Sequence, residues 1–143
     1  MLQIQAIQKY ENQGTPIYDY FFLRQNYRVF EIYSTIEDAI KNLPYDIKDI
    51  DLIVSASYSP YDTVATIAHL AQRKYDIPNM RALYASAACS SFVNGLEIVE
   101  GYFASGKAKK ALLVCSEHNT YYSNESDPKC GHLWGDAAVA FFL

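Results

Sequence analysis

The sequence has 143 residues, 50% of them hydrophobic and 20% charged, which is enough for one domain with its own core. Lys and Arg number 12 against 16 Asp and Glu, a net charge of −4, and no segment concentrates the basic residues that bind a nucleic-acid backbone. The apolar runs are shorter than the roughly 18 residues of a membrane span, and no secretory signal opens the chain. We therefore expect a soluble, cytoplasmic protein without a nucleic-acid or membrane partner.

Residues 1–29 show no sustained hydrophobic period, and only a short strand near Leu2–Ile7 is expected there. From Phe30 to Leu43 the apolar side chains recur mostly at spacings of three and four, which predicts an amphipathic helix. Pro44 ends this helix, because proline lacks the N–H that would continue it.

A compact β-branched run at Ile50–Ala56 (IDLIVSA) predicts a strand covered on both faces. A helix is expected over Thr63–Tyr75, where apolar residues have helical spacing and Asp62 is a candidate N-cap. Met80–Ala85 can form the next strand, and a cluster of small residues, Ser86–Ser91, follows it.

The remaining chain alternates in the same way. Phe92–Ala104 is predicted as a helix, Ala111–Cys115 as a buried strand, residues 116–130 as a polar loop, and Ala137–Leu143 as a final strand. This alternation predicts an α/β fold, with a layered, mostly parallel mixed sheet that carries helices on its faces. We expect a single domain over residues 1–143.

Three cysteines, an odd number without CxxC spacing, predict neither a disulfide framework nor a zinc site. Cys89 lies between a predicted strand and a predicted helix, where the helix N–H groups and dipole stabilise a thiolate and lower the thiol pKa from about 8.5. The same N–H groups can hold the oxyanion that forms when the thiolate attacks a carbonyl. Composition alone leaves an alternative open, because a cysteine among alanines is most often a small buried hydrophobic residue.

Residues 86–106 (SAACSSFVNGLEIVEGYFASG) resemble the nucleophile segment of the thiolase-fold condensing enzymes, most closely ketoacyl-ACP synthase III. Other segments resemble the same family in the same order, so that the similarity covers roughly residues 35–143. These segments are Asp51–Val54 with Pro60, Lys107–Glu117 and Gly135–Ala140. In the last of them, alanine replaces the family's usual glycine after the aspartate. The resemblance implies a thiolase-like half, similar to the N-terminal half of the family's chain.

The resemblance also implies that Cys89 is the catalytic nucleophile, which accepts an acyl group from acyl-CoA or an acyl carrier protein as a thioester. A carbanion made by decarboxylating a malonyl thioester then attacks this acyl-enzyme. Trp134 would line the acyl pocket, with packing between sheet and helix as the alternative. Lys129 would meet the phosphates of the donor or, alternatively, be solvated. No metal or redox cofactor is implied.

In this family the catalytic histidine and asparagine come from the second half of the chain, and none of His69, His118 and His132 occupies the family's histidine motif. One hypothesis is therefore a fragment or truncated chain that keeps the nucleophile. A second is a non-catalytic interaction subunit that forms a homodimer or pairs with a complete ketosynthase. The second hypothesis depends on residues 1–29, because an absent first strand would expose an edge of the sheet.

A third hypothesis is acyl transfer or hydrolysis by Cys89 with Glu117 as a candidate general base. Glu117 and His118 follow a strand whose carboxyl end lies beside the nucleophile turn. The alternative for this Glu-His pair is solvation at the start of a polar loop. Cys115, at the end of a buried strand, is expected to be inert, and Cys130 to be an exposed loop thiol.

Overall fold

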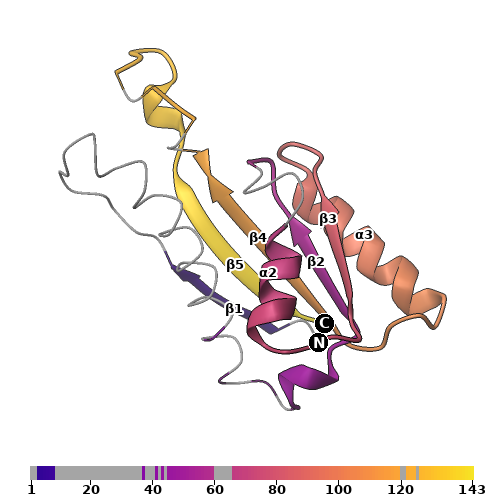
Figure 1. Cartoon of the computed structure of the whole chain (residues 1–143). Helices are drawn as coiled ribbons and strands as arrows, with labels where there is room; N and C mark the ends of the chain where they lie inside the picture. The colour runs from indigo at the N-terminus through magenta and orange to yellow at the C-terminus, as the bar shows by residue number, and fades with distance from the viewer. Residues whose placement is uncertain are drawn as a thin grey trace.

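The computed structural model describes residues 3–8, 37, 41, 43, 45–59, 66–119, 122–124 and 126–143, and for residues 3–8 and His132 it describes the backbone alone (Figure 1). Most of the helix expected over Phe30–Leu43, with Pro44, and the expected N-cap Asp62 lie outside these residues. Within the described part, no helix is long and apolar enough to cross a membrane.

Five strands form one sheet in the order β1-β5-β4-β2-β3. β2 pairs in parallel with both β3 and β4, whereas β5 pairs antiparallel with β4 and β1. The predicted α/β fold with a mixed sheet is therefore confirmed. The strands are β1 (Gln3–Gln8), β2 (Leu52–Ala56), β3 (Arg81–Ala85), β4 (Ala111–His118) and β5 (Asp136–Phe142).

β1 settles the question of the sheet edge beside β5. The strand expected near Leu2–Ile7 is present as β1, and Gln3 pairs with Phe142 of β5. The β5 edge of the sheet is therefore not exposed through the absence of a first strand, and the premise of the second hypothesis is wrong. The other outer strand of the described sheet is β3, which follows β2 in the strand order.

A helix covers each face of the sheet (Figure 1). α2 (Ile67–Lys74) contributes its buried side chains to one core together with Ile53 of β2, while α3 (Ser91–Ala104) packs over Leu52 and Val54 on the other face. Successive residues of β2 therefore enter opposite cores, because side chains alternate across a strand. All five residues of β2 are buried, as the continuous apolar run predicts.

β4 is longer than the sequence predicts. It continues through Ser116, Glu117 and His118, which pair with β5, so the expectation of a polar loop from residue 116 is wrong for these three residues. Their polar groups have partners inside the fold, since the Ser116 carbonyl accepts a 2.7 Å hydrogen bond from Ser57 Oγ. Polar composition concealed the strand because its hydrogen bonds depend on contacts distant in sequence.

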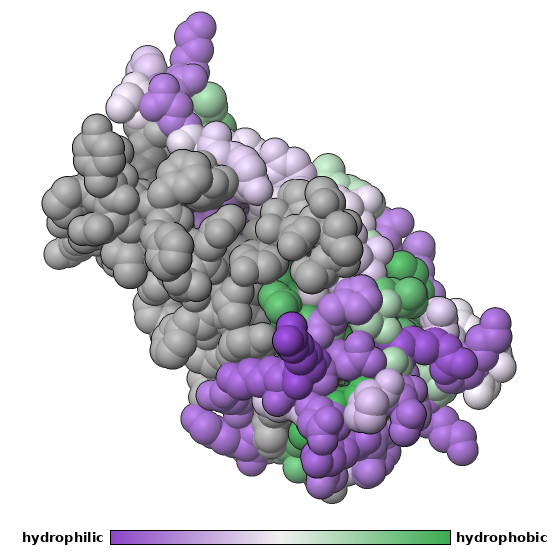
Figure 2. Space-filling view, viewed as in Figure 1, coloured by the Kyte–Doolittle hydropathy of each residue, from purple (hydrophilic) through white to green (hydrophobic). Residues whose placement is uncertain are grey.

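The two ends of the sheet differ in surface character. Hydrophilic side chains gather over the end that carries the 3-10 helix η1 (Ile47–Asp49), as Figure 2 shows. At the opposite end, a second 3-10 helix, η3 (Gly131–Leu133), precedes β5. The carboxyl ends of β2, β3 and β4 lie at that opposite end, so the loops that follow these parallel strands meet there.

Candidate active site

The turn between β3 and α3 holds Cys89, two residues before the first residue of α3. Ala88, immediately before it, has φ of 50°, a left-handed conformation that costs an L-residue about 1–2 kcal/mol. The hydroxyl of Ser91 stabilises this turn, because it donates to the Ala88 carbonyl at 2.7 Å and accepts from the Ala87 N–H at 2.9 Å. The bend leaves Cys89 exposed, so this cysteine is not the small buried residue of the alternative interpretation.

Gly95 lets α3 approach the sheet closely beneath this turn. A Cβ at this position would lie 2.8 Å from Leu113 Cδ1 and 3.2 Å from Ala56 Cβ, closer than side-chain carbons normally pack. The start of α3 therefore lies directly against β2 and β4. This contact brings Cys89 over the carboxyl ends of these strands, a role for Gly95 that the sequence analysis missed.

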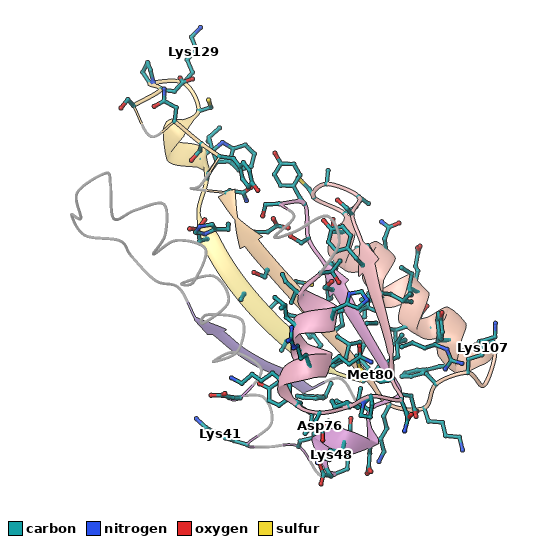
Figure 3. All side chains as sticks on the ribbon, viewed as in Figure 1. Lys41, Lys48, Asp76, Met80, Lys107 and Lys129 are labelled. Carbon is teal, nitrogen blue, oxygen red and sulfur yellow. The ribbon has the colours of Figure 1, made fainter. Side chains whose placement is uncertain are left out.

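Cys89 lines a pocket of about 350 Å³ at the carboxyl ends of the strands. The pocket brings together all three residues that the sequence analysis singled out as a site, namely Cys89, Glu117 and Trp134. The lining residues come from β2, β4, the start of α3 and the loops that follow β2, β3 and β4, and one of them directly follows η3. They are Ala56, Tyr58, Ala88, Cys89, Ser91, Phe92, Cys115, Glu117, Asn119 and Trp134. Lys129 is exposed and does not line it (Figure 3).

The pocket changes from an aromatic mouth to an apolar interior. Tyr58 and Trp134 are 47% and 43% exposed, and their rings stack with centroids 6.3 Å apart. Ala56, in contrast, is 1% exposed, and Phe92 packs against Phe141 with ring centroids 5.0 Å apart. A polar ligand group is accommodated at the mouth, and an aliphatic group gains most from the interior.

Glu117 holds the loop that follows β2. Its carboxylate accepts hydrogen bonds from the Tyr58 N–H at 2.6 Å, the Ser59 N–H at 3.0 Å and the Ser59 hydroxyl at 2.7 Å. The alternative of a solvated Glu-His pair is therefore wrong, since Glu117 is half-buried and His118 is buried. Three donors on one carboxylate favour a positioning role for Glu117 over proton abstraction.

Two of the three histidines have structural partners in the described part of the chain. His118 Nδ1 lies 2.9 Å from Asp136 Oδ2, and the two residues face each other in the β4–β5 register. His69 is exposed on α2, with Nδ1 2.8 Å from Thr66 Oγ1. No histidine is among the described residues that line the pocket.

The other two thiols are held in the protonated form by their surroundings. Burial, assisted by the negative charge of Glu117, raises the pKa of Cys115 to about 12. Cys130 is exposed, as expected, and its thiol donates to Asp127 Oδ2 at 3.2 Å, which raises the pKa of Cys130. Unlike Cys130, Cys115 lines the pocket.

The lining residues that sequence reasoning missed include Tyr58, Phe92, Cys115 and Asn119. Tyr58 lies two residues beyond β2 and Asn119 directly after β4, so the rule that ligands bind at the carboxyl ends of parallel strands could have found them. Phe92 and Cys115 carried no such signal. Among the described residues, no group of three or more His, Cys, Asp and Glu side chains could hold a metal ion.

Comparison with known proteins agrees with this geometry. The family model of 3-oxoacyl-[acyl-carrier-protein] synthase III matches residues 85–143, which include the Cys89 turn, α3, β4 and β5. Over 113 residues the chain is 37% identical to the β-ketoacyl-ACP synthase III of Acholeplasma laidlawii. The alignment covers 78% of this chain and 36% of that relative. The chain is a relative of the ketoacyl-ACP synthase III family of thiolase-fold condensing enzymes.

Further relatives of this ketoacyl-ACP synthase III-like chain show the same pattern. It is 29% identical over 111 residues to synthase III 2 of Staphylococcus epidermidis, across 78% of this chain and 34% of that protein. The crystal structure of the Aquifex aeolicus synthase III superposes with a TM-score of 0.74 at 27% identity, over 80% of this chain and 37% of that one. The chain thus spans about a third of the length of the curated relatives that it matches.

One structure matches nearly the whole chain. The 3-oxoacyl-ACP synthase of Burkholderia xenovorans aligns over 99% of this chain and 47% of its own length, with a TM-score of 0.73 and 19% identity. At that identity the similarity concerns the fold alone. The thiolase-like fold predicted from sequence is confirmed.

Proposed function

We propose that Cys89 accepts an acyl group from an acyl-CoA or acyl carrier protein thioester, as the first step of a ketoacyl synthase III-type decarboxylative condensation. The observation that carries this proposal is the exposed thiol of Cys89 on the turn before α3, at a pocket with an apolar interior. The match of the family model across the same turn supports it.

The proposed step is a thioester exchange. The thiolate of Cys89 attacks the carbonyl carbon of the donor thioester, and the oxyanion that forms is stabilised by backbone N–H groups at the positive end of α3. As the intermediate collapses, the bond between the carbonyl carbon and the donor sulfur breaks. The donor leaves as a thiolate that takes up a proton from solvent, and the acyl group stays on Cys89.

The later steps require groups besides those that line this pocket. Decarboxylation of a malonyl thioester leaves a negative charge on the thioester oxygen, which hydrogen-bond donors must stabilise. His118 is held by Asp136, and His69 lies on α2 beside Thr66, so neither is placed by the described contacts to serve Cys89. We therefore assign the acyl-accepting step to the described residues and the carbon–carbon bond formation to groups outside them.

Trp134 and Glu117 have distinct roles in this proposal. Trp134, stacked on Tyr58 at the mouth, contacts the arm of the donor as it enters. Glu117 fixes the loop that carries Tyr58, because its carboxylate accepts the N–H groups of Tyr58 and Ser59. Under this assignment Glu117 is a positioning residue, and the role of general base considered from the sequence is not needed for acyl transfer.

The test is incubation of the chain with acetyl-CoA, followed by intact mass spectrometry and peptide mapping. We expect one acetyl group on Cys89, none on Cys89→Ala, and an unchanged extent of labelling in Cys130→Ala, whose thiol lies outside the pocket. An adduct that persists in Cys89→Ala, or a wild-type chain that acquires no adduct from any acyl-CoA or acyl carrier protein, would overturn the proposal.

We also propose that the chain pairs with a second copy or with a complete ketosynthase through β3. β3 is the outer strand of the described sheet on that side, and its Arg81 and Tyr84 side chains are exposed. Analytical ultracentrifugation is expected to show a dimer or a stable complex with a ketosynthase. A monomer that binds neither contradicts this pairing.

The cytoplasmic location and the expected lack of a metal or redox cofactor stay predictions.

A further inference from the structure

We infer that Cys115, with its cross-strand neighbour Ala56, limits the length of the acyl chain that Cys89 can carry. This inference rests on the proposed function, because it names the residue that sets the acyl-chain selectivity of the same pocket. Cys115 takes part as a wall of the binding site and not as a nucleophile.

Cys115 and Ala56 form the sheet side of the pocket. They are direct partners in the parallel pairing of β2 with β4, and both line the pocket that Cys89 lines from the turn before α3. Ala56 is buried and Cys115 is half-buried, whereas Tyr58 and Trp134 at the mouth are largely exposed. An acyl chain attached to Cys89 and directed away from the mouth therefore meets these two small side chains.

The side chains that line the pocket become more polar along β4, from Cys115 toward Asn119. Cys115 and Glu117 lie two positions apart on one face of the strand, and Asn119, the first residue after the strand, lines the same pocket. Each residue of a strand advances about 3.3 Å, which places Glu117 about 7 Å along β4 from Cys115. Polar parts of a thioester donor are accommodated by Glu117 and Asn119, and its hydrocarbon part by Cys115.

The space behind Ala56 is already filled. α3 approaches so closely that a Cβ on Gly95 would lie 3.2 Å from Ala56 Cβ, and Leu113 occupies the adjoining volume. A larger side chain at position 56 would therefore press on the helix as well as enter the pocket. Cys115 is the position where a change of side-chain size alters the pocket most directly.

The state of the Cys115 thiol suits an apolar contact. Its pKa of about 12 keeps it uncharged at neutral pH, and an uncharged thiol behaves as a small hydrophobic group. Phe92, which forms the adjacent wall, is packed against Phe141, so this wall does not readily move aside for a branched or long chain.

The test measures the rate at which Cys89 is acylated by acetyl-, butyryl-, hexanoyl- and octanoyl-CoA in the full chain. We expect the wild type to discriminate against the longer donors. Cys115→Ala should raise the ratio of hexanoyl to acetyl transfer several-fold, and Cys115→Leu should lower it about tenfold or more, since one methylene in an apolar pocket changes selectivity by about 10- to 200-fold. Cys115→Ser keeps the size of the side chain and should keep the ratio, and Cys130→Ala should leave both rates and ratio unchanged.

A second measurement separates failure of this inference from failure of the proposed function. N-alkyl iodoacetamides of increasing chain length alkylate Cys89, forming a sulfur–carbon bond as iodide leaves and the thiol proton passes to the buffer. If no thioester acylates the wild type but alkylation depends on chain length and on residue 115, the proposed function fails and the pocket assignment stands. If neither reagent series responds to the size of residue 115 in variants whose circular dichroism matches the wild type, the inference is overturned.

Discussion

The turns before and after β3 each contain one non-glycine residue with a positive φ, but the two residues differ in how easily they adopt it. Asp76 before the strand and Ala88 after it have φ of 52° and 50°, and they are the two non-glycine residues with positive φ in the described part of the chain. Aspartate adopts this conformation with little penalty, whereas alanine does not. The turn at Asp76 is thus an ordinary connection, and the one at Ala88 is maintained against a cost.

Their surroundings explain the difference. Asp76 is at the charged end of the sheet, where its carboxylate lies 4.0 Å from Lys48 Nζ in a highly exposed pair (Figure 3). The Ser91 hydroxyl holds the turn at Ala88, because it donates to the Ala88 carbonyl and accepts from the Ala87 N–H, and the thiol that follows Ala88 faces an apolar pocket. A strained turn stabilised by its own helix is typical of a site where geometry serves chemistry.

The largest expected effect is the difference in alkylation rate between Cys89, which lies on the Ala88 turn, and Cys115, which lies in the sheet. At pH 8 only on the order of one in ten thousand Cys115 side chains is a thiolate, given its pKa of about 12. Iodoacetamide should therefore modify Cys89 first, Cys130 more slowly and Cys115 only in the unfolded chain, as peptide mapping over time will show. Modification of Cys115 before Cys89 would contradict the contrast between the turn and the sheet.

The same pKa gives a pH dependence of stability with a definite sign. Because folding raises the pKa of Cys115 above its ordinary value of 9.0, the thiol favours the folded state fully below about pH 9, and this contribution is lost as the pH rises toward 12. Denaturant unfolding at alkaline pH should show a smaller loss in Cys115→Ala than in the wild type. An equal loss in both proteins would mean that another group dominates.

Removal of the hydroxyl that holds the Ala88 turn tests whether the turn is strained. Ser91→Ala leaves the Ala87 N–H and the Ala88 carbonyl without this partner, at a cost of about 1–3 kcal/mol in unfolding free energy. Misplacement of Cys89 should lower its acylation rate about tenfold or more. The control is Ser105→Ala at the other end of α3, where the exposed hydroxyl donates to Tyr102 O and its loss should cost under about 0.5 kcal/mol.

The close approach of α3 can be tested with two glycines of the same helix. Gly95→Ala forces a methyl group against Leu113 and Ala56 and should destabilise the fold by about 1–3 kcal/mol. Gly101→Ala meets no atom within 4 Å and should stabilise it by about 0.5–1 kcal/mol through helix propensity. Urea unfolding of both variants decides the matter, and equal effects at the two positions would refute the packing argument.

The smallest effect compares the two turns directly. Ala88→Gly removes the steric penalty of the left-handed conformation and, after the added entropy of the unfolded chain, should change the unfolding free energy by less than about 1 kcal/mol in the stabilising direction. Asp76→Gly should give no such gain, because aspartate already tolerates this conformation. A larger gain at Asp76 than at Ala88 would reverse the comparison.

Much of the fold was predictable because its signals are local. The apolar run of β2, the helical spacing of α3 and the small residues around Cys89 each reflect neighbours in sequence, and the structure places these elements within one or two residues of expectation. The continuation of β4 through His118 was not predictable in this way. Its polar residues are satisfied by Ser57, Ser59 and Asp136, which lie far away in sequence.

The sequence by itself determined the alternation of helices and strands and the position of a cysteine at a strand-to-helix turn, because periodicity and turn chemistry are properties of short segments. Tertiary structure alone decided which further side chains share the pocket with Cys89, Glu117 and Trp134. Cys115, Phe92 and Tyr58 come from separate elements and meet Cys89 only once β2, β4 and α3 pack together. The contact at Gly95 that makes this packing possible depends on distances across the sheet, which no local pattern encodes.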